Sequence, residues 1–382
     1  MKFYDEILLR NEYAQQLAKR WYSEGLLNDA QLAEIYQTHA AIPSNPNLFI
    51  KICLFLFGCI CFSFGAGFAA LFLGVGFSVV SLVYAGGVLF LLRNIIKERK
   101  LHFNGVDNAL LYGVVAATLP AIFEVYELLN LDQPWVGGLL FLPVLCWVAY
   151  SFGEPVVAVG VLLCGLFVVA SLLILHPLGR ALLPFALMIC AGVVYFVLRP
   201  LSRQIRYFYW QWAIEWVQVA ALVLLYLAGN YGFVREANAQ LNNLPSPAPQ
   251  ITFAPLFWGL TFAVPLVYFY WGVRWRSRVL LLLAMVGLGA SVATLYQYTL
   301  FLPLEWLLLV GGGVIVCFCI WLIRRLKTPR LGFACIPEAI SHERAFLQTI
   351  ALSQAAQQTQ LNTPDFKMGG GDFGGAGAGN DY

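Results

Sequence analysis

Two glutamates with helical spacing are the strongest candidates for chemistry in this sequence. Glu124 and Glu127 stand three residues apart in the stretch LPAIFEVYELLN, so on a helix they share one face. Two carboxylates on one face can share a proton or hold a cation. Pro120, four residues before Glu124, also frees a backbone carbonyl nearby. These features make the pair the centre of a candidate polar site.

Four further polar side chains are expected at the same level of the molecule. They are Tyr126, His176, Gln297 and Glu305, each at or near the outer end of an apolar segment. Ionisable residues in membrane segments are costly, which makes them functional candidates. Together with the glutamate pair, these residues predict a polar vestibule near the outer face. The alternative, that they only face external water at helix ends, stays open.

A structural ion pair is expected elsewhere, between Glu215 and Arg206, with Arg203 as the alternative partner. Glu215 lies just inside an apolar segment, and Arg206 ends the cluster RPLSRQIR before it. An opposite charge would offset the cost of a carboxylate at that depth. Asp107 and Glu154 are expected near the inner ends of their helices, where a charge costs little.

No catalytic, metal or cofactor signature accompanies these residues. The sequence has no HExxH, GxSxG, Walker A or dinucleotide-binding motif. Its nine cysteines include no CxxC pair and lie mostly in apolar runs, which indicates small buried hydrophobes. The sequence therefore predicts a protein that is not an enzyme and that uses no metal and no cofactor.

The elements that must position the polar residues are hydrophobic helices. Of the 382 residues, 60% are hydrophobic and 11% charged, whereas about a quarter of a soluble domain is charged. A bilayer core requires about 20 apolar residues per helix. Ten segments meet this requirement: 48–71, 73–92, 106–129, 135–152, 156–175, 181–198, 212–231, 253–272, 279–298 and 304–323. The sequence thus predicts an all-α polytopic membrane protein with the lipid bilayer as its main partner.

The distribution of basic residues supports ten spans and predicts their orientation. With the N-terminus inside, only Arg180 and Arg235 of the 23 lysines and arginines fall outside. Both ends of the chain are then cytoplasmic. Eight or nine spans with a re-entrant piece remain an alternative, because some segments are short. The net charge of +3 gives no reason to expect a nucleic acid partner.

Four regions are predicted along the chain. Residues 1–47 form a helical hairpin, with Asn28 and Gln31 as a capping box, and residues 48–323 form the bundle. Residues 324–363 form a juxtamembrane amphipathic segment, and the glycine-rich residues 364–382 form a disordered tail. The external connection GFVREANAQLNNLPSPAPQIT is expected to be extended because of its prolines.

The tetrapeptide YFYW occurs twice, at 207–210 and 268–271, each time beside an arginine cluster. Tyr and Trp favour the headgroup level of a bilayer, where the ring is buried and its polar atom stays wet. The two copies are therefore predicted to mark one interface, at the cytoplasmic ends of one helical hairpin.

The pattern LAKRWYSEGLLNDAQLAEIYQ, followed at once by many hydrophobic spans, resembles a family of predicted bacterial inner-membrane proteins of unknown function. The resemblance covers about the first 90 residues and implies a multi-pass protein of the bacterial inner (cytoplasmic) membrane.

The predicted vestibule, hairpin and tail suggest two functions as hypotheses. One is a transporter of a small solute or ion through the outer vestibule. The other is a scaffold or accessory subunit that binds protein partners through the hairpin or the glycine-rich tail.

Overall fold

The chain is built from helices throughout the residues that the structure describes. The structure is a computed structural model, and it describes residues 2–39, 47–72, 77–99, 102–202, 204–245 and 248–299, with Leu309, 311–313, Val316, Cys317, Ile320 and Arg324. The predicted span 304–323 lies almost entirely outside these residues, as do Glu305, the segment 324–363 beyond Arg324 and the tail 364–382.

A short helical hairpin precedes the membrane helices. It consists of α1 (Glu6–Ser23) and α2 (Asp29–Thr38). The backbone N–H of Gln31 donates to the side chain of Asn28 at 2.8 Å. In return, the backbone N–H of Asn28 donates to the side chain of Gln31 at 3.0 Å. The predicted capping box is therefore confirmed, and it starts α2 immediately after the turn.

Nine helices in the described part of the chain are long and apolar enough to cross a membrane. The all-α polytopic fold class is therefore confirmed, while the orientation of the chain remains a prediction. The helices are α3 (Leu48–Phe72), α4 (Phe77–Arg99), α5 (Val106–Leu128), α6 (Pro134–Phe152), α7 (Pro155–Ile174), α8 (Pro177–Leu201), α9 (Gln211–Gly229) with the short 3₁₀ helix η1 (Ile205–Trp210) before it, α11 (Ala254–Trp275) and α12 (Arg278–Thr299).

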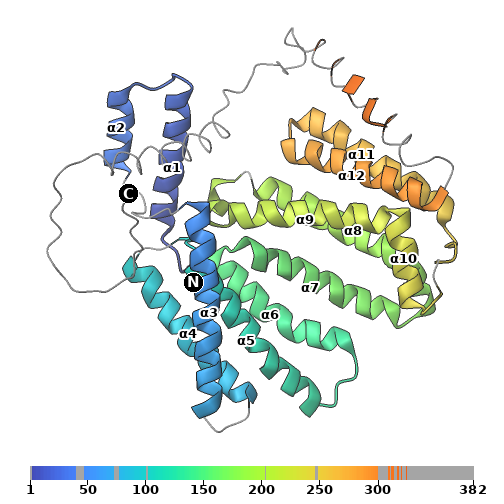
Figure 1. Cartoon of the computed structure of the whole chain (residues 1–382), viewed down its shortest axis with the longest axis horizontal. Coiled ribbons are helices and arrows are strands. Elements are labelled where there is room, and N and C mark those ends of the chain that lie inside the picture. Colours follow the sequence, from blue (N-terminus) through green and yellow to red (C-terminus); the bar gives the residue numbers. More distant parts are fainter. Residues whose placement is uncertain are drawn as a thin grey trace, which may run out of the picture.

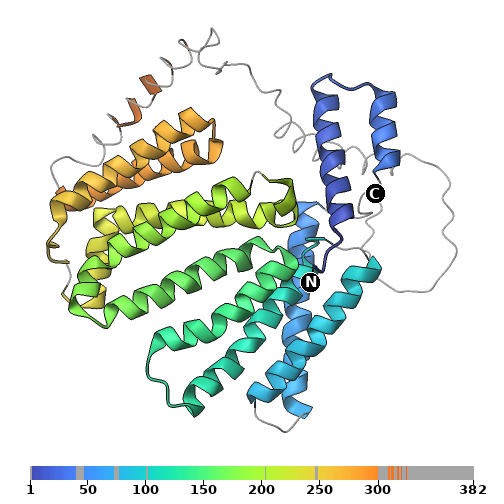
Figure 2. The ribbon, with the colours of Figure 1, turned by 180° about the vertical axis from the view of Figure 1, so that it is seen from behind.

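The membrane helices spread like a fan. The ends of α6 and α8 and the beginnings of α5, α7 and α9 converge close to the N-terminus (Figures 1 and 2). The opposite ends diverge along an arc from α5 to α12. Polar groups at the converging ends are therefore brought together, whereas those at the diverging ends are kept apart.

One helix was not expected from the sequence. The segment predicted to be extended instead begins with α10 (Tyr231–Leu241), so that prediction is wrong for its first half. The side chain of Asn230 accepts from the backbone N–H of Phe233 at 3.1 Å and caps the new helix. The prolines follow α10, where they no longer oppose a helix.

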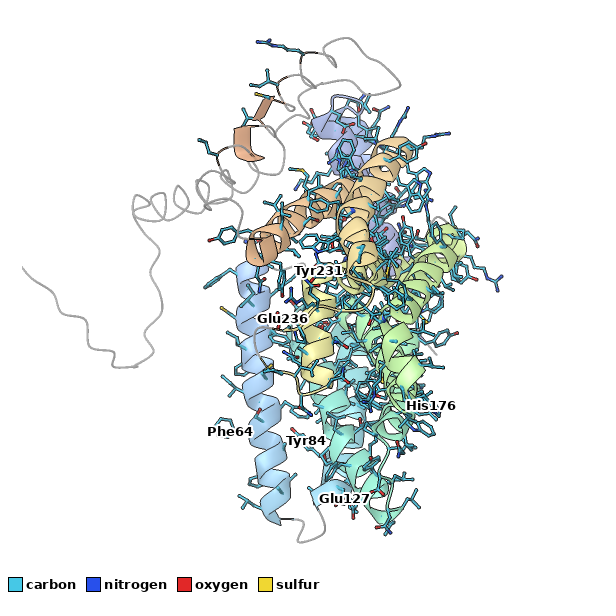
Figure 3. The ribbon with its side chains drawn as sticks, turned by 90° about the vertical axis from the view of Figure 1, so that its right-hand side faces the viewer. Phe64, Tyr84, Glu127, His176, Tyr231 and Glu236 are labelled. Carbon is cyan, nitrogen blue, oxygen red and sulfur yellow. The ribbon has the colours of Figure 1, made fainter. Side chains whose placement is uncertain are left out.

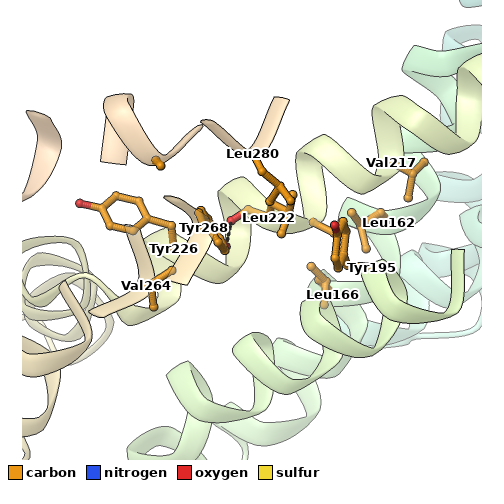
Figure 4. Close-up of a cluster of buried hydrophobic side chains, with 11 residues drawn as sticks. Leu162, Leu166, Tyr195, Val217, Leu222, Tyr226, Val264, Tyr268 and Leu280 are labelled. Carbon is orange, nitrogen blue, oxygen red and sulfur yellow. Dashed lines mark hydrogen bonds between the residues drawn. The ribbon is translucent and has the colours of Figure 1, made fainter. Parts of the chain in front are cut away.

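The largest core lies between α7, α8, α9, α11 and α12 and consists of aliphatic and tyrosine side chains (Figure 4). Tyr268 is 3% exposed, and its phenol donates to the carbonyl of Leu222 at 2.7 Å. Tyr209, from the other YFYW copy, is also buried. The expectation that the polar atom stays wet is thus wrong for these two tyrosines, because each phenol donates to a backbone carbonyl of another helix.

Candidate functional site

The residues of the predicted outer vestibule do not form one site in the described part of the chain. Glu124, Tyr126 and Glu127 lie at the end of α5, His176 precedes α8, and Gln297 lies near the end of α12. Glu127 and His176 are well separated in Figure 3. Glu124, Glu127, His176 and Gln297 are exposed, and Tyr126 is half-buried.

The fan explains this separation. Helix α5 packs on α3, α4 and α6, whereas α12 packs on α9, α10 and α11. The ends of α5 and α12 lie at opposite sides of the diverging arc (Figure 1). In the described residues these groups are instead exposed separately at helix ends, which fits the alternative to a vestibule better.

The predicted ion pair between Glu215 and Arg206 is not formed, and the alternative partner Arg203 lies outside the described residues. The carboxylate of Glu215 instead accepts from the side-chain amide of Gln211 at 3.1 Å, one helical turn away. Arg206 lies in η1, before α9 starts, and faces a different cavity from Glu215. Both side chains are exposed, so neither requires the other to offset burial.

Asp107 is a buried carboxylate at the start of α5, and it is 1% exposed. Its Oδ1 accepts from the backbone N–H groups of Asn104, Gly105 and Asn108 at 2.9, 3.1 and 3.0 Å. Its Oδ2 accepts from the phenol of Tyr4 at 2.9 Å. Because a helix start is electropositive, this carboxylate is stabilised by α5 while it binds the N-terminal segment.

Glu154 is a second buried carboxylate, in the two-residue connection between α6 and α7. It is 2% exposed. Its Oε2 accepts from the N–H of Val157 at 2.7 Å and its Oε1 from the phenol of Tyr112 at 2.5 Å. Burial raises the pKa of Glu154 above its ordinary value; these hydrogen bonds partly counteract the rise, and the nearby Asp107 adds to it.

The N-terminal segment binds Asp107 and packs on the end of α6, next to the connection that carries Glu154. We call residues 2–5 the strap. The N–H of Phe3 donates to the carbonyl of Ser151 at 3.1 Å, and its ring stacks on Phe152 with centroids 4.3 Å apart. Burial raises the pKa of the Tyr4 phenol well above its ordinary value, and the Asp107 carboxylate adds to the rise. Tyr4 therefore stays a hydrogen-bond donor over the physiological pH range.

Asp107 and Glu154 lie at helix ends, as expected, and the side of the membrane that these ends face remains a prediction. The expectation that a charge costs little at these positions is wrong, because both carboxylates are buried. The phenol of Tyr4 in the strap donates to Asp107, and the phenol of Tyr112 in α5 donates to Glu154. The sequence does indicate that each acid stands next to a helix start, at Gly105-Val106 and at Glu154-Pro155. The partner tyrosines lie 103 and 42 residues away and give no such signal.

We expect Glu154→Gln to change the pH dependence of stability. The raised pKa means that the folded state holds the proton more tightly than the unfolded state. Stability from Glu154 is therefore full below the ordinary pKa of 4.5 and is lost as pH rises through the folded-state value. Thermal unfolding in detergent, followed between pH 4 and pH 7, should favour the variant increasingly as pH rises. The exposed Glu98→Gln is the control, and equal slopes for both variants would contradict the prediction.

An uncharged polar network joins α9, α11 and α12. Asn230 donates to the hydroxyls of Tyr226 and Thr294 at 2.9 and 3.2 Å. The hydroxyl of Ser291 donates to the backbone carbonyl of Thr261. The hydroxyl of Thr261 accepts from the backbone N–H of Tyr231, the first residue of α10. Since these hydroxyls are bonded to one another or to backbone carbonyls, the network fixes the joint between α9 and α10 and offers no free group to a ligand.

Two large cavities lie where α8 and α9 face α7, and residues of all three helices line both of them. The strap-side cavity measures about 1040 Å³ and is bounded by α6, α7, the second half of α8, η1 and the start of α9. The loop-side cavity measures about 600 Å³ and is bounded by α7, the first half of α8, the end of α9, α10 and the segment 250–253. Leu166 of α7 lines both cavities.

Both cavities have mainly apolar walls with basic residues at their ends. Lys2 of the strap and Arg206 line the strap-side cavity, and Arg180 lines the loop-side cavity. Among the described residues, no aspartate or glutamate lines either one. These residues also include no cluster of histidine, cysteine or acidic side chains that could hold a metal ion.

Comparisons of this chain with protein-family models, with curated proteins and with solved structures found no match. The class that the fold defines is a polytopic α-helical membrane protein.

Proposed function

We propose that this chain transports a solute with a long apolar body across the bacterial inner membrane. The observation that supports the proposal is the pair of cavities on one face of α8 and α9, with Leu166 between them. A solute could occupy either cavity and pass from one to the other when the side chain of Leu166 moves aside. Apolar walls favour an amphiphile over the small ion that the predicted vestibule would suit.

The strap is suited to control one end of this path. Its Lys2 lines the strap-side cavity, with the ammonium 4.7 Å from the ring centroid of Trp210. Tyr4, two residues further, is bound to Asp107. Undocking of the strap would therefore move a cation away from the cavity wall.

Transport can be tested with the native cysteine Cys190, which lines the strap-side cavity. Two chains are reconstituted in vesicles, one that keeps Cys190 alone and one that keeps the exposed Cys61 of α3 alone. The vesicles contain fluorescent phosphatidylglycerol or phosphatidylcholine, and dithionite quenching reports movement of the label between leaflets. A bulky maleimide on Cys190 should slow this movement by about tenfold or more, as expected when an obstacle of this size fills a packed path.

The same maleimide on Cys61 should leave the rate unchanged, because that thiol lies on α3 and lines neither cavity. Since modification follows folding, a loss of rate cannot be a folding defect. Label movement no faster than in protein-free vesicles, for both lipids and both unmodified chains, would overturn the proposal.

A scaffold or accessory role is the second candidate. It is favoured by apolar side chains that the hairpin leaves exposed, among them Trp21, Leu26 and Tyr36. Complementation of a deletion strain separates the two functions. Leu26→Glu should abolish complementation but leave label movement intact if the hairpin binds a partner, whereas a transporter needs no such surface.

A further inference from the structure

The strap-side cavity combines an apolar groove with an available cation. Arg206 is exposed at its edge and forms no ion pair with any described residue. Lys2 also lines the cavity, but its ammonium is paired with Glu6. Arg206 is therefore the cation that can meet a ligand without first losing a partner.

The rings around Arg206 suit a boundary between apolar and polar parts of a ligand. Tyr207 and Trp210 line the cavity beside it, and Trp210 stacks on Tyr150 with centroids 5.2 Å apart. Rings of this kind favour the level at which lipid headgroups meet acyl chains. Beyond them, Cys146, Val161 and Val193 continue the apolar wall along α6, α7 and α8.

The volume also fits a lipid better than a small solute. At about 1040 Å³ the cavity is as large as the largest common ligand pockets. No acidic side chain among the described lining residues opposes an anion at Arg206. Basic pockets between membrane helices bind the headgroups of anionic lipids on the same principle.

We propose that the strap-side cavity binds an anionic phospholipid, with its acyl chains between α6, α7 and α8 and its phosphate at Arg206. The loop-side cavity differs, because its Arg180 already donates to the carbonyl of Ile174 at 2.9 Å and no Tyr or Trp among the described residues lines it. As a statement of the transported substrate, this inference rests on the proposed transport function. As a statement of binding, it stands on the cavity alone.

Binding is tested in a zwitterionic detergent, with the chain that keeps Cys190 alone. The rate of maleimide alkylation is measured while phosphatidylglycerol or phosphatidylcholine with the same acyl chains is added. Phosphatidylglycerol should protect Cys190 at the lower concentration. Arg206→Gln should raise its half-protecting concentration about five- to tenfold, the effect of one basic residue on an anionic headgroup. Arg206→Lys should largely restore protection.

Arg274→Gln is the matched control, because Arg274 is equally classed as exposed and lines neither cavity. It should leave the half-protecting concentration unchanged. Equal protection by both lipids would mean that bulk lipid merely covers an apolar groove, and it would overturn the inference. Protection by inorganic phosphate alone, or equal effects of Arg206→Gln and Arg274→Gln, would also overturn it.

The binding result can be separated from the transport result. Selective protection that depends on Arg206, together with no label movement in vesicles, would retain this site and reject the proposed transporter. Label movement without selective protection would retain transport and reject an anionic substrate bound at Arg206.

Discussion

Asp107→Ala is expected to lower the free energy of unfolding by about 3–4 kcal/mol, because it leaves buried hydrogen-bond donors without an acceptor. Three of these donors are backbone N–H groups at the start of α5, and the fourth is the phenol of Tyr4. Water entering the vacated space and the removal of a desolvated charge keep the loss below the sum of four separate penalties. Thermal unfolding in detergent, followed by tryptophan fluorescence, measures the effect.

Asp132→Ala is the matched control for this substitution. Asp132 is exposed in the connection that follows α5, at the opposite end of the same helix. A surface substitution of this kind should change stability by no more than about 0.5 kcal/mol. Tyr4→Phe removes only one donor and should fall between the two, at about 1 kcal/mol. If Asp107→Ala is no worse than Asp132→Ala, the carboxylate does not hold the strap.

Gly105→Ala is the second substitution with a large expected effect, a loss of about 3–5 kcal/mol from backbone strain and steric overlap together. Gly105 has a φ of +102°, which side chains with a Cβ rarely adopt. An added Cβ would lie 2.3 Å from the carbonyl oxygen of Lys51 and 3.0 Å from the backbone nitrogen of Phe55. Both contacts are backbone atoms of α3, so a rotamer change cannot relieve them.

The consequence should be displacement of α3 from α5, with a lower unfolding temperature and less folded protein in the membrane. Gly87→Ala is the same chemical change on α4, where an added Cβ meets nothing within 4 Å. It should be neutral or stabilise by up to about 1 kcal/mol, since alanine favours a helix. Equal behaviour of the two variants would show that α3 does not approach Gly105 closely.

The membrane helices could be predicted from the sequence because their lengths follow from a local requirement. Lipid cannot satisfy backbone hydrogen bonds, so each span must be a continuous apolar helix of about 20 residues. The span predicted over 156–175 is α7 (Pro155–Ile174), and that over 106–129 is α5 (Val106–Leu128). Helix α8 starts at Pro177, four residues before the predicted span 181–198, because proline is favoured in the first turn of a helix.

The candidate site could not be predicted in the same way. Glu124 and Glu127 share a helix face as their spacing predicts, but the divergence of α5 from α12 keeps them from Gln297. Conversely, Asp107 and Glu154 stand at helix ends where a charge was expected to cost little, yet both are buried, and Tyr4 of the strap binds Asp107. The sequence around either acid does not indicate its burial, because the partner tyrosine is distant. Tyr4, for example, is 103 residues from Asp107.

The sequence by itself therefore determined the class of protein, the positions of the described spans and the capping of the N-terminal hairpin. These depend on apolar length, composition and contacts between residues three or four apart. Only the tertiary structure decided which helix ends meet, which carboxylates lose their water and where Arg206 and Leu166 meet a cavity. These properties depend on the angles at which whole helices pack, and packing between distant segments leaves no periodic trace in the sequence.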